Sequence, residues 1–247
     1  MSAVKTVMSA GIRSTFRHKI VPIVMVPILL ICVIGVALLL CLLLIGPEVN
    51  SASPDRAFLE SNLTLLLYSS SLITIGVTLN SIVFQTMVRE KTRGNLAALM
   101  ATPLKLTDIW VGKSLALFVP GLLLAIIFTA LTLVVINLIY FVPDIGFLLN
   151  WEMLVLSLIA VPLIYLFFGL LVHLIGFTSK SATGNVVAQV FLPLMANLGI
   201  QLTVQGAMKA DSWQFLVMHL AIAAVAGILV LACKPRLIPE RVTLSAG

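Results

Sequence analysis

Neutral polar side chains recur at helical spacing inside two otherwise apolar segments of this sequence. They are Tyr68, Ser71, Thr74, Thr78, Ser81 and Gln85 in the segment 59–88, and Gln189, Asn197 and Gln201 in the segment 186–205. The first set is spaced by three or four residues and therefore follows one face of a helix. Hydroxyls and amides form hydrogen bonds without carrying charge. Two interpretations remain open: hydrogen bonds between packed helices, or a pathway for a polar or amphipathic solute.

Charged side chains gather instead in the stretch from Arg89 to Lys113. It holds seven of the 24 charged residues of the chain, which has 15 Lys+Arg and 9 Asp+Glu. Pro103 interrupts this stretch, because a proline disfavours a helical residue before it and has no N–H group to donate. The stretch is therefore expected to form two helical pieces, one on each side of Pro103.

The first of these pieces is predicted to be a short amphipathic helix with Asn95 as its N-cap. Its apolar face consists of Leu96, Leu99 and Met100. Thr107 or Asp108 is expected to cap the helix that follows. A helix of this kind binds either lipid headgroups or a groove on a cytoplasmic partner, and the residues alone leave both options open.

The composition places these elements in a membrane. Of the 247 residues, 61% are hydrophobic and 10% are charged, against about 25% charged in soluble domains. A soluble surface with so few charges would expose large apolar patches and aggregate. This excludes a soluble domain and a disordered chain. The net charge of +6 does not indicate a nucleic-acid partner, because the cytoplasmic loops of membrane proteins collect Lys and Arg.

Six segments are apolar over the roughly 20 residues that a helix needs to cross about 30 Å of hydrocarbon. They are approximately 20–46, 59–88, 114–142, 152–177, 186–205 and 214–233. We therefore predict an all-α, polytopic membrane protein with six transmembrane helices in a single domain, 1–247. Residues 1–19 predict an amphipathic helix on the inner membrane surface, and 89–113 is the cytoplasmic segment between the second and third spans.

The basic residues predict the orientation. With both termini on the inner side, all of the 15 Lys and Arg residues except Arg56 and Lys209 lie on that side. Positive charge favours the cytoplasmic side, so we expect a multi-pass protein of the cell (inner) membrane with both termini in the cytoplasm. No carboxylate lies deep in a predicted span, where proton- or sodium-coupled carriers usually have one. If the protein is a transporter, its energy is expected to come from elsewhere.

The segment 89–113 resembles the signature of ABC-type-2 permeases, the membrane subunits of ATP-binding-cassette exporters. The matching residues are Arg89, Glu90, Lys91, Gly94, Leu96, Leu99, Met100, Ala101, Thr102, Pro103, Leu104, Ile109, Gly112 and Lys113. Its place between the second and third of six spans, behind a surface helix at the N-terminus, is similar to that family as well. Asn95 and Ala97 stand where the family usually has Thr and Glu. An acidic contact to the ATPase is therefore either absent or supplied by Asp108 or Glu90.

The resemblance implies a coupling helix that docks on a separate ATP-binding subunit. The expected contact residues are Arg89, Glu90, Arg93, Gly94, Leu96, Leu99, Met100, Thr102, Pro103 and Asp108. The chain has no Gly-x-x-x-x-Gly-Lys-(Ser/Thr) phosphate loop, so it is not expected to be an enzyme. No cofactor or metal is expected in this chain, and ATP and Mg²⁺ would bind the partner ATPase.

The resemblance also implies a second permease copy, identical or homologous, and a substrate pathway lined by both sets of polar residues, because spans two and five line it in relatives. The expected function is export of an amphipathic or lipid-like substrate by alternating access, with membrane lipid as a further partner and no nucleic acid. The alternatives are an ATP-independent carrier or channel, and a non-transport membrane scaffold or electron-transfer anchor.

Overall fold

The computed structural model describes residues 3–17, 20–92, 101–143, 145–178, 181–238 and 242. Some helical side chains, including all of those of 81–92, lie outside this description. The regular structure in the described ranges is helical, which confirms the all-α prediction. The helices are α1 (Ala3–Arg17), α2 (Ile20–Leu40), η1 (Cys41–Ile45), α3 (Gly46–Val49), α4 (Arg56–Thr92), α6 (Leu106–Ile136), η2 (Asn137–Phe141), α7 (Trp151–Val155), η3 (Leu156–Ala160), α8 (Val161–Thr178), α9 (Ser181–Val204), α10 (Trp213–Cys233) and η4 (Lys234–Arg236).

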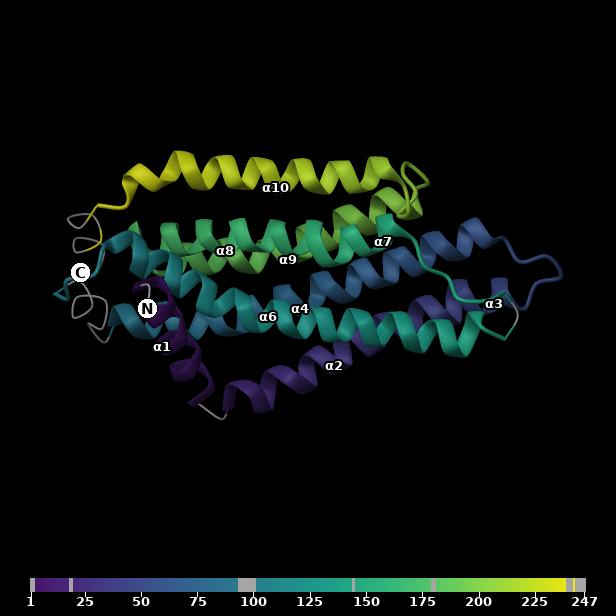
Figure 1. Ribbon diagram of the computed structural model, residues 1–247, viewed down its shortest axis with the longest axis horizontal. Coiled ribbons are helices and arrows are strands. Elements are labelled where there is room, and N and C mark those ends of the chain that lie inside the picture. The colour runs from purple at the N-terminus through teal and green to yellow at the C-terminus, as the bar shows by residue number, and fades with distance from the viewer. Residues whose placement is uncertain are drawn as a thin grey trace.

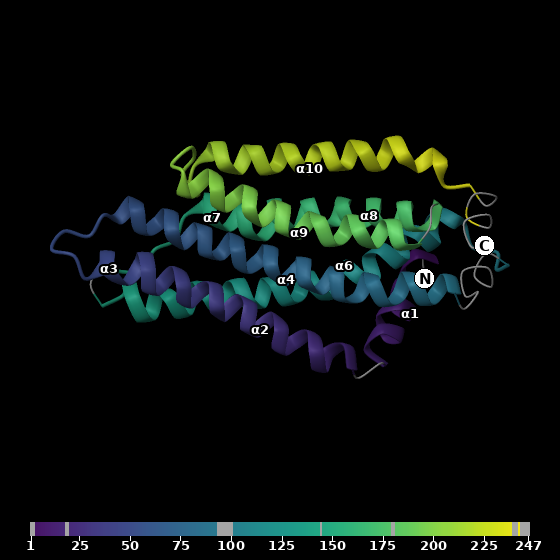
Figure 2. The same ribbon diagram turned by 180° about the vertical axis from the view of Figure 1, so that it is seen from behind.

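The long helices lie side by side in one elongated bundle (Figures 1 and 2). The start of α6, the end of α10 and α1 lie at one end of the bundle, which we call the α1 end. The turns after α3 and before α7 lie at the other, which we call the α3 end. Successive long helices therefore run in alternating directions along the bundle, as short connections require.

Five helical segments in the described part of the chain are long and apolar enough to cross a membrane. They are Val26–Val49, Arg56–Asn80, Leu106–Phe141, Trp151–Thr178 and Trp213–Arg236. Three of them continue through π-helical turns, η1, η2 and η3, without a break in the helical path. The helix α9, which corresponds to the predicted span 186–205, is not among the five. Five of the six predicted spans thus contain helices of sufficient length and apolarity, and the arrangement of six spans across a membrane stays a prediction.

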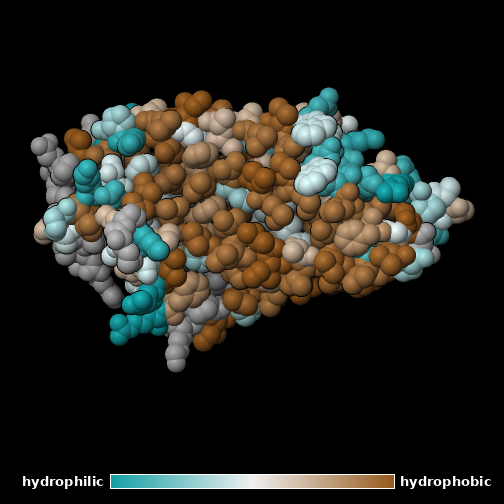
Figure 3. All heavy atoms as spheres, viewed as in Figure 1, coloured by the Kyte–Doolittle hydropathy of each residue, from teal (hydrophilic) through white to brown (hydrophobic). Residues whose placement is uncertain are grey.

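Helix α4 is the centre of the bundle and contacts α2, α6, α8 and α9. It has the lowest mean hydropathy of the five segments, yet 89% of the residues in its most apolar stretch are buried, against 22% in the segments of α2 and α6. Polar side chains facing lipid would lose hydrogen bonds to water without gaining others. The least apolar helix therefore lies inside, and the most apolar helices form the outside. Figure 3 shows the resulting belt of hydrophobic residues between two more polar ends.

The predicted amphipathic helix at the N-terminus is present as α1, and it packs on the first turns of α6. Val7 is buried there, and a methyl group added at Gly112 would lie 2.8 Å from its Cβ. A methyl group at Gly11 would likewise lie 2.8 Å from Cβ of Ala116. Glycine at these two positions thus allows the helices to meet closely, as small residues do at membrane helix contacts.

Helix α6 begins earlier than the sequence predicted, and the prediction that Thr107 or Asp108 caps it is wrong. Its first residue is Leu106, and Lys105 before it has an extended backbone (φ −68°, ψ 138°) without a side-chain cap. The carbonyl of Lys105 already accepts hydrogen bonds from the backbone N–H groups of Asp108 (2.9 Å) and Ile109 (3.1 Å). Asp108 therefore lies inside the first turn, where its negative charge suits the helix dipole.

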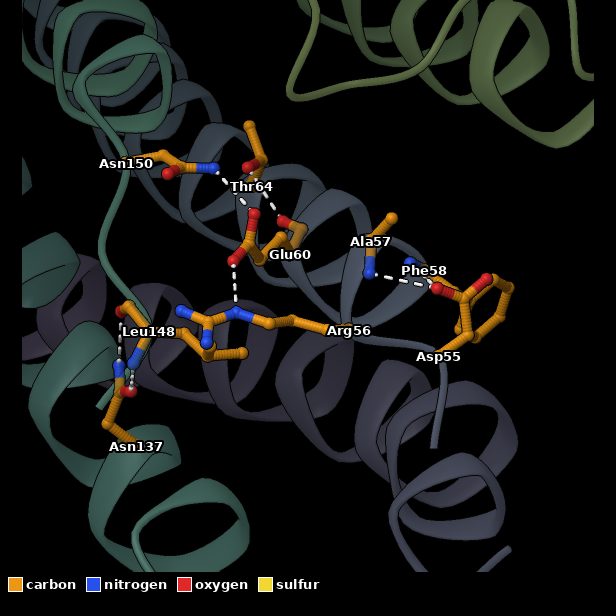
Figure 4. Close-up of polar contacts among 9 residues, drawn as sticks. All are labelled: Asp55, Arg56, Ala57, Phe58, Glu60, Thr64, Asn137, Leu148 and Asn150. Atoms are coloured by element: carbon orange, nitrogen blue, oxygen red, sulfur yellow. Dashed lines mark hydrogen bonds and ion pairs between the residues drawn. The ribbon is translucent and has the colours of Figure 1, made fainter. Parts of the chain in front are cut away.

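Polar side chains fix the loops at the α3 end (Figure 4). The backbone N–H of Leu148 donates to Oδ1 of Asn137 (2.6 Å), and Nδ2 of Asn137 donates to the carbonyl oxygen of Leu148 (3.2 Å). Glu60 accepts hydrogen bonds from Nε of Arg56 (2.9 Å) and from Nδ2 of Asn150 (2.9 Å). The loop after η2 is thus attached to both η2 and α4 at this end of the bundle.

Candidate functional site

The polar face of α4 points into the bundle. Tyr68, Ser71, Thr74 and Thr78 are at most 1% exposed, so the described part of the predicted stripe shares one buried face. The side chains of Ser81 and Gln85 lie outside the described residues. A stripe that is buried on a central helix first of all holds helices together, which is one of the two interpretations that the sequence left open.

Two threonines of this stripe satisfy their hydroxyls within α4 itself. Oγ1 of Thr74 donates to the carbonyl oxygen of Ser70, and Oγ1 of Thr78 donates to that of Thr74, both at 2.7 Å. A hydroxyl that donates to its own helix in this way can lie in an apolar core without a hydrogen-bond partner on another helix. Gly121 of α6 lies directly against Thr78, since a methyl group there would come within 3.3 Å of its Cβ. Thr78 therefore takes part in a close contact between α4 and α6.

Tyr68 lies at the centre of a polar contact between three helices. Its hydroxyl donates to the carbonyl oxygen of Met195 on α9 (3.2 Å) and lies 3.2 Å from Nε2 of His219 on α10. Nδ1 of His219 lies 2.8 Å from the carbonyl oxygen of Phe215. A carbonyl only accepts, so Nδ1 carries the proton in the neutral ring, and Nε2 is a second acceptor for the single proton of the Tyr68 hydroxyl.

The sequence did not indicate that His219 would meet Tyr68. Both are buried, and their rings lie 5.0 Å apart in an edge-on arrangement. Gly199 of α9 makes room for this contact, because a methyl group there would lie 2.6 Å from Cε1 of Tyr68. The only signal in the sequence was an isolated histidine within an apolar span. Its partner, 151 residues away along the chain, follows from packing alone.

The polar residues of α9 face the other way. Gln189, Asn197 and Gln201 are exposed and line an open hollow of about 660 Å³ on the side of the bundle. The other lining residues are Val190, Pro193, Leu194, Leu198 and Leu202. We call this hollow the α9 groove. It combines three neutral amides with an aliphatic wall, so it suits the surface of another amphipathic molecule or helix.

The two predicted polar sets therefore do not meet in this protomer. The described residues of the α4 set are enclosed by neighbouring helices, and the three α9 amides lie on the outer surface. Met195 lies between Gln189 and Asn197 in the sequence of α9. It is buried, and its backbone carbonyl accepts the hydrogen bond from Tyr68. Helix α9 thus presents its backbone and apolar side to α4, and its amides to the outer surface of the bundle. Whether either set lines a substrate pathway stays a prediction.

Five of the ten predicted contact residues of the coupling segment lie outside the described residues, namely Arg93, Gly94, Leu96, Leu99 and Met100. Of Arg89 and Glu90 only the backbone is described, within α4. Thr102 and Pro103 are exposed at the α1 end, and Asp108 is half-buried in the first turn of α6. Thr102 and Pro103 are therefore accessible on the side of the bundle that the charge pattern predicts to be cytoplasmic.

No protein-family model, curated protein or solved structure matches this chain. The resemblance of 89–113 to the permease signature therefore stays a prediction. Across the described residues, no group of three or more His, Cys, Asp or Glu side chains is placed to hold a metal ion. Two surfaces of the described residues are therefore candidates for a functional role: the exposed residues before α6 and the α9 groove.

Proposed function

We propose that this protein is the permease subunit of an ATP-binding-cassette transporter, with both termini in the cytoplasm. The observation that carries the proposal is the sequence of 89–113, together with the exposure of Thr102 and Pro103 at the α1 end of a bundle of membrane helices. In this proposal the segment docks on a separate ATPase, which binds ATP and Mg²⁺. Closure of the ATPase subunits then moves α4 and α6, the two helices that the segment joins.

In this proposal α9 also crosses the membrane, as the fifth of six spans. It has 24 residues, which is about 36 Å of helix at 1.5 Å per residue, and it packs against α4 and α8. Amide side chains at membrane depth need protein or water to face, because lipid offers them no hydrogen bonds. The exposed amides of the α9 groove therefore indicate that a further protein surface or an aqueous path lies beside α9 in the assembly.

A second permease copy beside α9 meets this requirement. Each amide carries a donor and an acceptor, so two copies of the same face related by a two-fold axis can pair their amides with one another. The substrate proposed for this pathway is amphipathic or lipid-like, and transport is outward, as in exporters. The support for this substrate class is the mixture of amides and aliphatic side chains around the α9 groove.

Isolation of the intact complex tests the proposal. The tagged protein is purified from its native membrane, and the co-purifying subunits are identified by mass spectrometry. We expect an ATPase subunit, and we expect Leu99→Asp to remove it, because a charge would be placed on the apolar face of the coupling helix. The matched control is Ser53→Asp, which adds the same charge to the exposed loop at the α3 end.

Two results would contradict the proposal. If Leu99→Asp leaves ATPase binding and stimulation as they are in the parent protein, the coupling segment is wrongly assigned. If the purified protein alone moves solute across a liposome membrane without nucleotide, it is a self-contained carrier or channel.

A further inference from the structure

A second hollow lies between α2 and α6, and it differs from the α9 groove in chemistry. It has a volume of about 360 Å³ and is bounded by residues 30–41 of α2 and η1 and by residues 128–140 of α6 and η2. We call it the α2–α6 groove. Its floor contains the buried residues Val33, Cys41 and Ile136, and its rims carry exposed side chains such as Ile34 and Ile139. Apart from Cys41, Thr132 and Tyr140, all of its lining residues are hydrocarbon or aromatic.

The two helices both pack on α4 and leave this groove open to the side of the bundle. Figure 3 shows mostly hydrophobic residues on the face formed by these helices. Water does not fill an apolar cavity of this kind, and an unfilled groove would lose the dispersion contacts of its walls. The groove therefore needs an apolar occupant, and the surrounding bilayer offers acyl chains.

The dimensions of the groove favour a chain over a helix. Eleven residue steps from Leu30 to Cys41 correspond to about 17 Å along the helix, close to the roughly 15 Å depth of one leaflet's hydrocarbon. A helix of that length and about 10 Å across would fill on the order of 1,300 Å³, several times the volume of the groove. The groove thus has the length of an acyl chain within one leaflet, and its volume is well below that of a helix of the same length.

One end of the groove is closed by a residue suited to the membrane interface. Tyr140 lies over Gly46, where an added methyl group would come 3.7 Å from its Cε1. This end is the α3 end of the bundle, which the charge pattern predicts to face outward. Tyrosine is enriched at headgroup level, because its ring is apolar and its hydroxyl is polar. An acyl chain in the groove would therefore have its headgroup beside Tyr140.

From these observations we propose that the α2–α6 groove binds one acyl chain of an outer-leaflet phospholipid. The lipid fills the gap between α2 and α6 and supports α2, which otherwise packs on the bundle through α4. This inference requires that the protein is embedded in a bilayer in the orientation that its basic residues predict, and it is independent of any coupling to an ATPase.

Photo-crosslinking tests the proposal on the full chain. The protein is reconstituted in vesicles of phosphatidylcholine and phosphatidylglycerol that contain a phosphatidylcholine with a diazirine in the middle of one chain. Labelled positions are then mapped by mass spectrometry. We expect labelling of the groove residues to exceed that of the exposed α10 residues Val225, Ile228 and Leu229 by about tenfold, which corresponds to about 1.4 kcal/mol of preferential binding.

A pair of matched variants separates the groove from general contact with lipid. Ala37→Phe places a ring inside the groove, and Ala224→Phe places the same ring on the exposed surface of α10. We expect the first variant to lose the tenfold preference and the second to keep it, and thermal unfolding shows that both variants are folded. Equal labelling of the groove and α10 in the parent protein would overturn the proposal, and this comparison needs no variant.

Discussion

The hydroxyl of Ser71 on α4 donates a hydrogen bond of 2.6 Å to the backbone carbonyl oxygen of Ser157. Ser157 lies in the π-helical turn η3, where the N–H of Val161 bonds to the carbonyl of Leu156. The next N–H that a π-turn would offer to Ser157 belongs to position 162, which is a proline and has none. Ser71 therefore satisfies a carbonyl that its own helix cannot satisfy, and this explains why a hydroxyl is buried at this point of α4.

Replacing Ser71 by alanine tests this relationship. The variant Ser71→Ala leaves the Ser157 carbonyl buried without a donor, so we expect a loss of about 1–2 kcal/mol in the free energy of unfolding. In a Pro162→Ala background the backbone regains an N–H group that can bond to this carbonyl. The same serine change should then have little effect. Denaturant unfolding of the four proteins of this double-mutant cycle measures the coupling, and an equal loss in both backgrounds would contradict the explanation.

Gly199 provides a second prediction, because it makes room for Tyr68. The variant Gly199→Ala places a methyl group 2.6 Å from the tyrosine ring, so the ring or α9 must shift, at about 1–3 kcal/mol. Gly35→Ala is the matched control, since nothing lies within 4 Å of its added methyl group. We expect it to be neutral or to stabilise the helix by up to about 1 kcal/mol. Thermal unfolding in detergent distinguishes the two, and equal effects would show that the contact is not tight.

Asn137 gives a third prediction, which concerns the loop at the α3 end. The variant Asn137→Leu leaves both backbone polar groups of the buried Leu148 without their partner, at about 1–3 kcal/mol for each group. We expect the loop 142–150 to detach and to become sensitive to protease. Asn150→Ala, which removes only one bond to Glu60, should have a smaller effect. Limited proteolysis with mass mapping measures both, and a loop that stays resistant in Asn137→Leu would contradict the assignment.

Asn197 gives the fourth prediction, which separates folding from assembly. Because Asn197 is exposed in the single protomer, Asn197→Leu should leave the unfolding of the protomer nearly unchanged. If two copies meet at the α9 groove, the same change should weaken their association by about 0.6–2 kcal/mol per lost hydrogen bond. The control is Val190→Leu, which keeps the groove apolar at a neighbouring position. Energy transfer between labelled copies in vesicles measures the association, and unchanged association with reduced stability would argue against this interface.

The positions of the helices could be predicted from the sequence because each is a long apolar run between polar segments. The span predicted at 152–177 corresponds to Trp151–Thr178, and the one at 214–233 to α10, Trp213–Cys233. The start of α6 was predicted too late, because Thr107 and Asp108 are of residue types preferred at an N-cap, whereas the helix begins at Leu106. The first turn of α6 is helical because the backbone carbonyl of Lys105 accepts hydrogen bonds from the N–H groups of Asp108 and Ile109. The residue types of this turn do not reveal these bonds.

The sequence also determined which polar residues share a helix face, since Tyr68, Ser71, Thr74 and Thr78 follow the helical period and are buried together. It did not determine what each face meets. In a membrane protein the lipid and the protein interior are both apolar, so hydrophobic periodicity does not distinguish an outward face from an inward one. Only the packing decided that the polar face of α4 lies inside, whereas the amides of α9 lie outside. The same holds for Ser157, whose need for Ser71 arises from a π-turn and a proline at one place in the bundle.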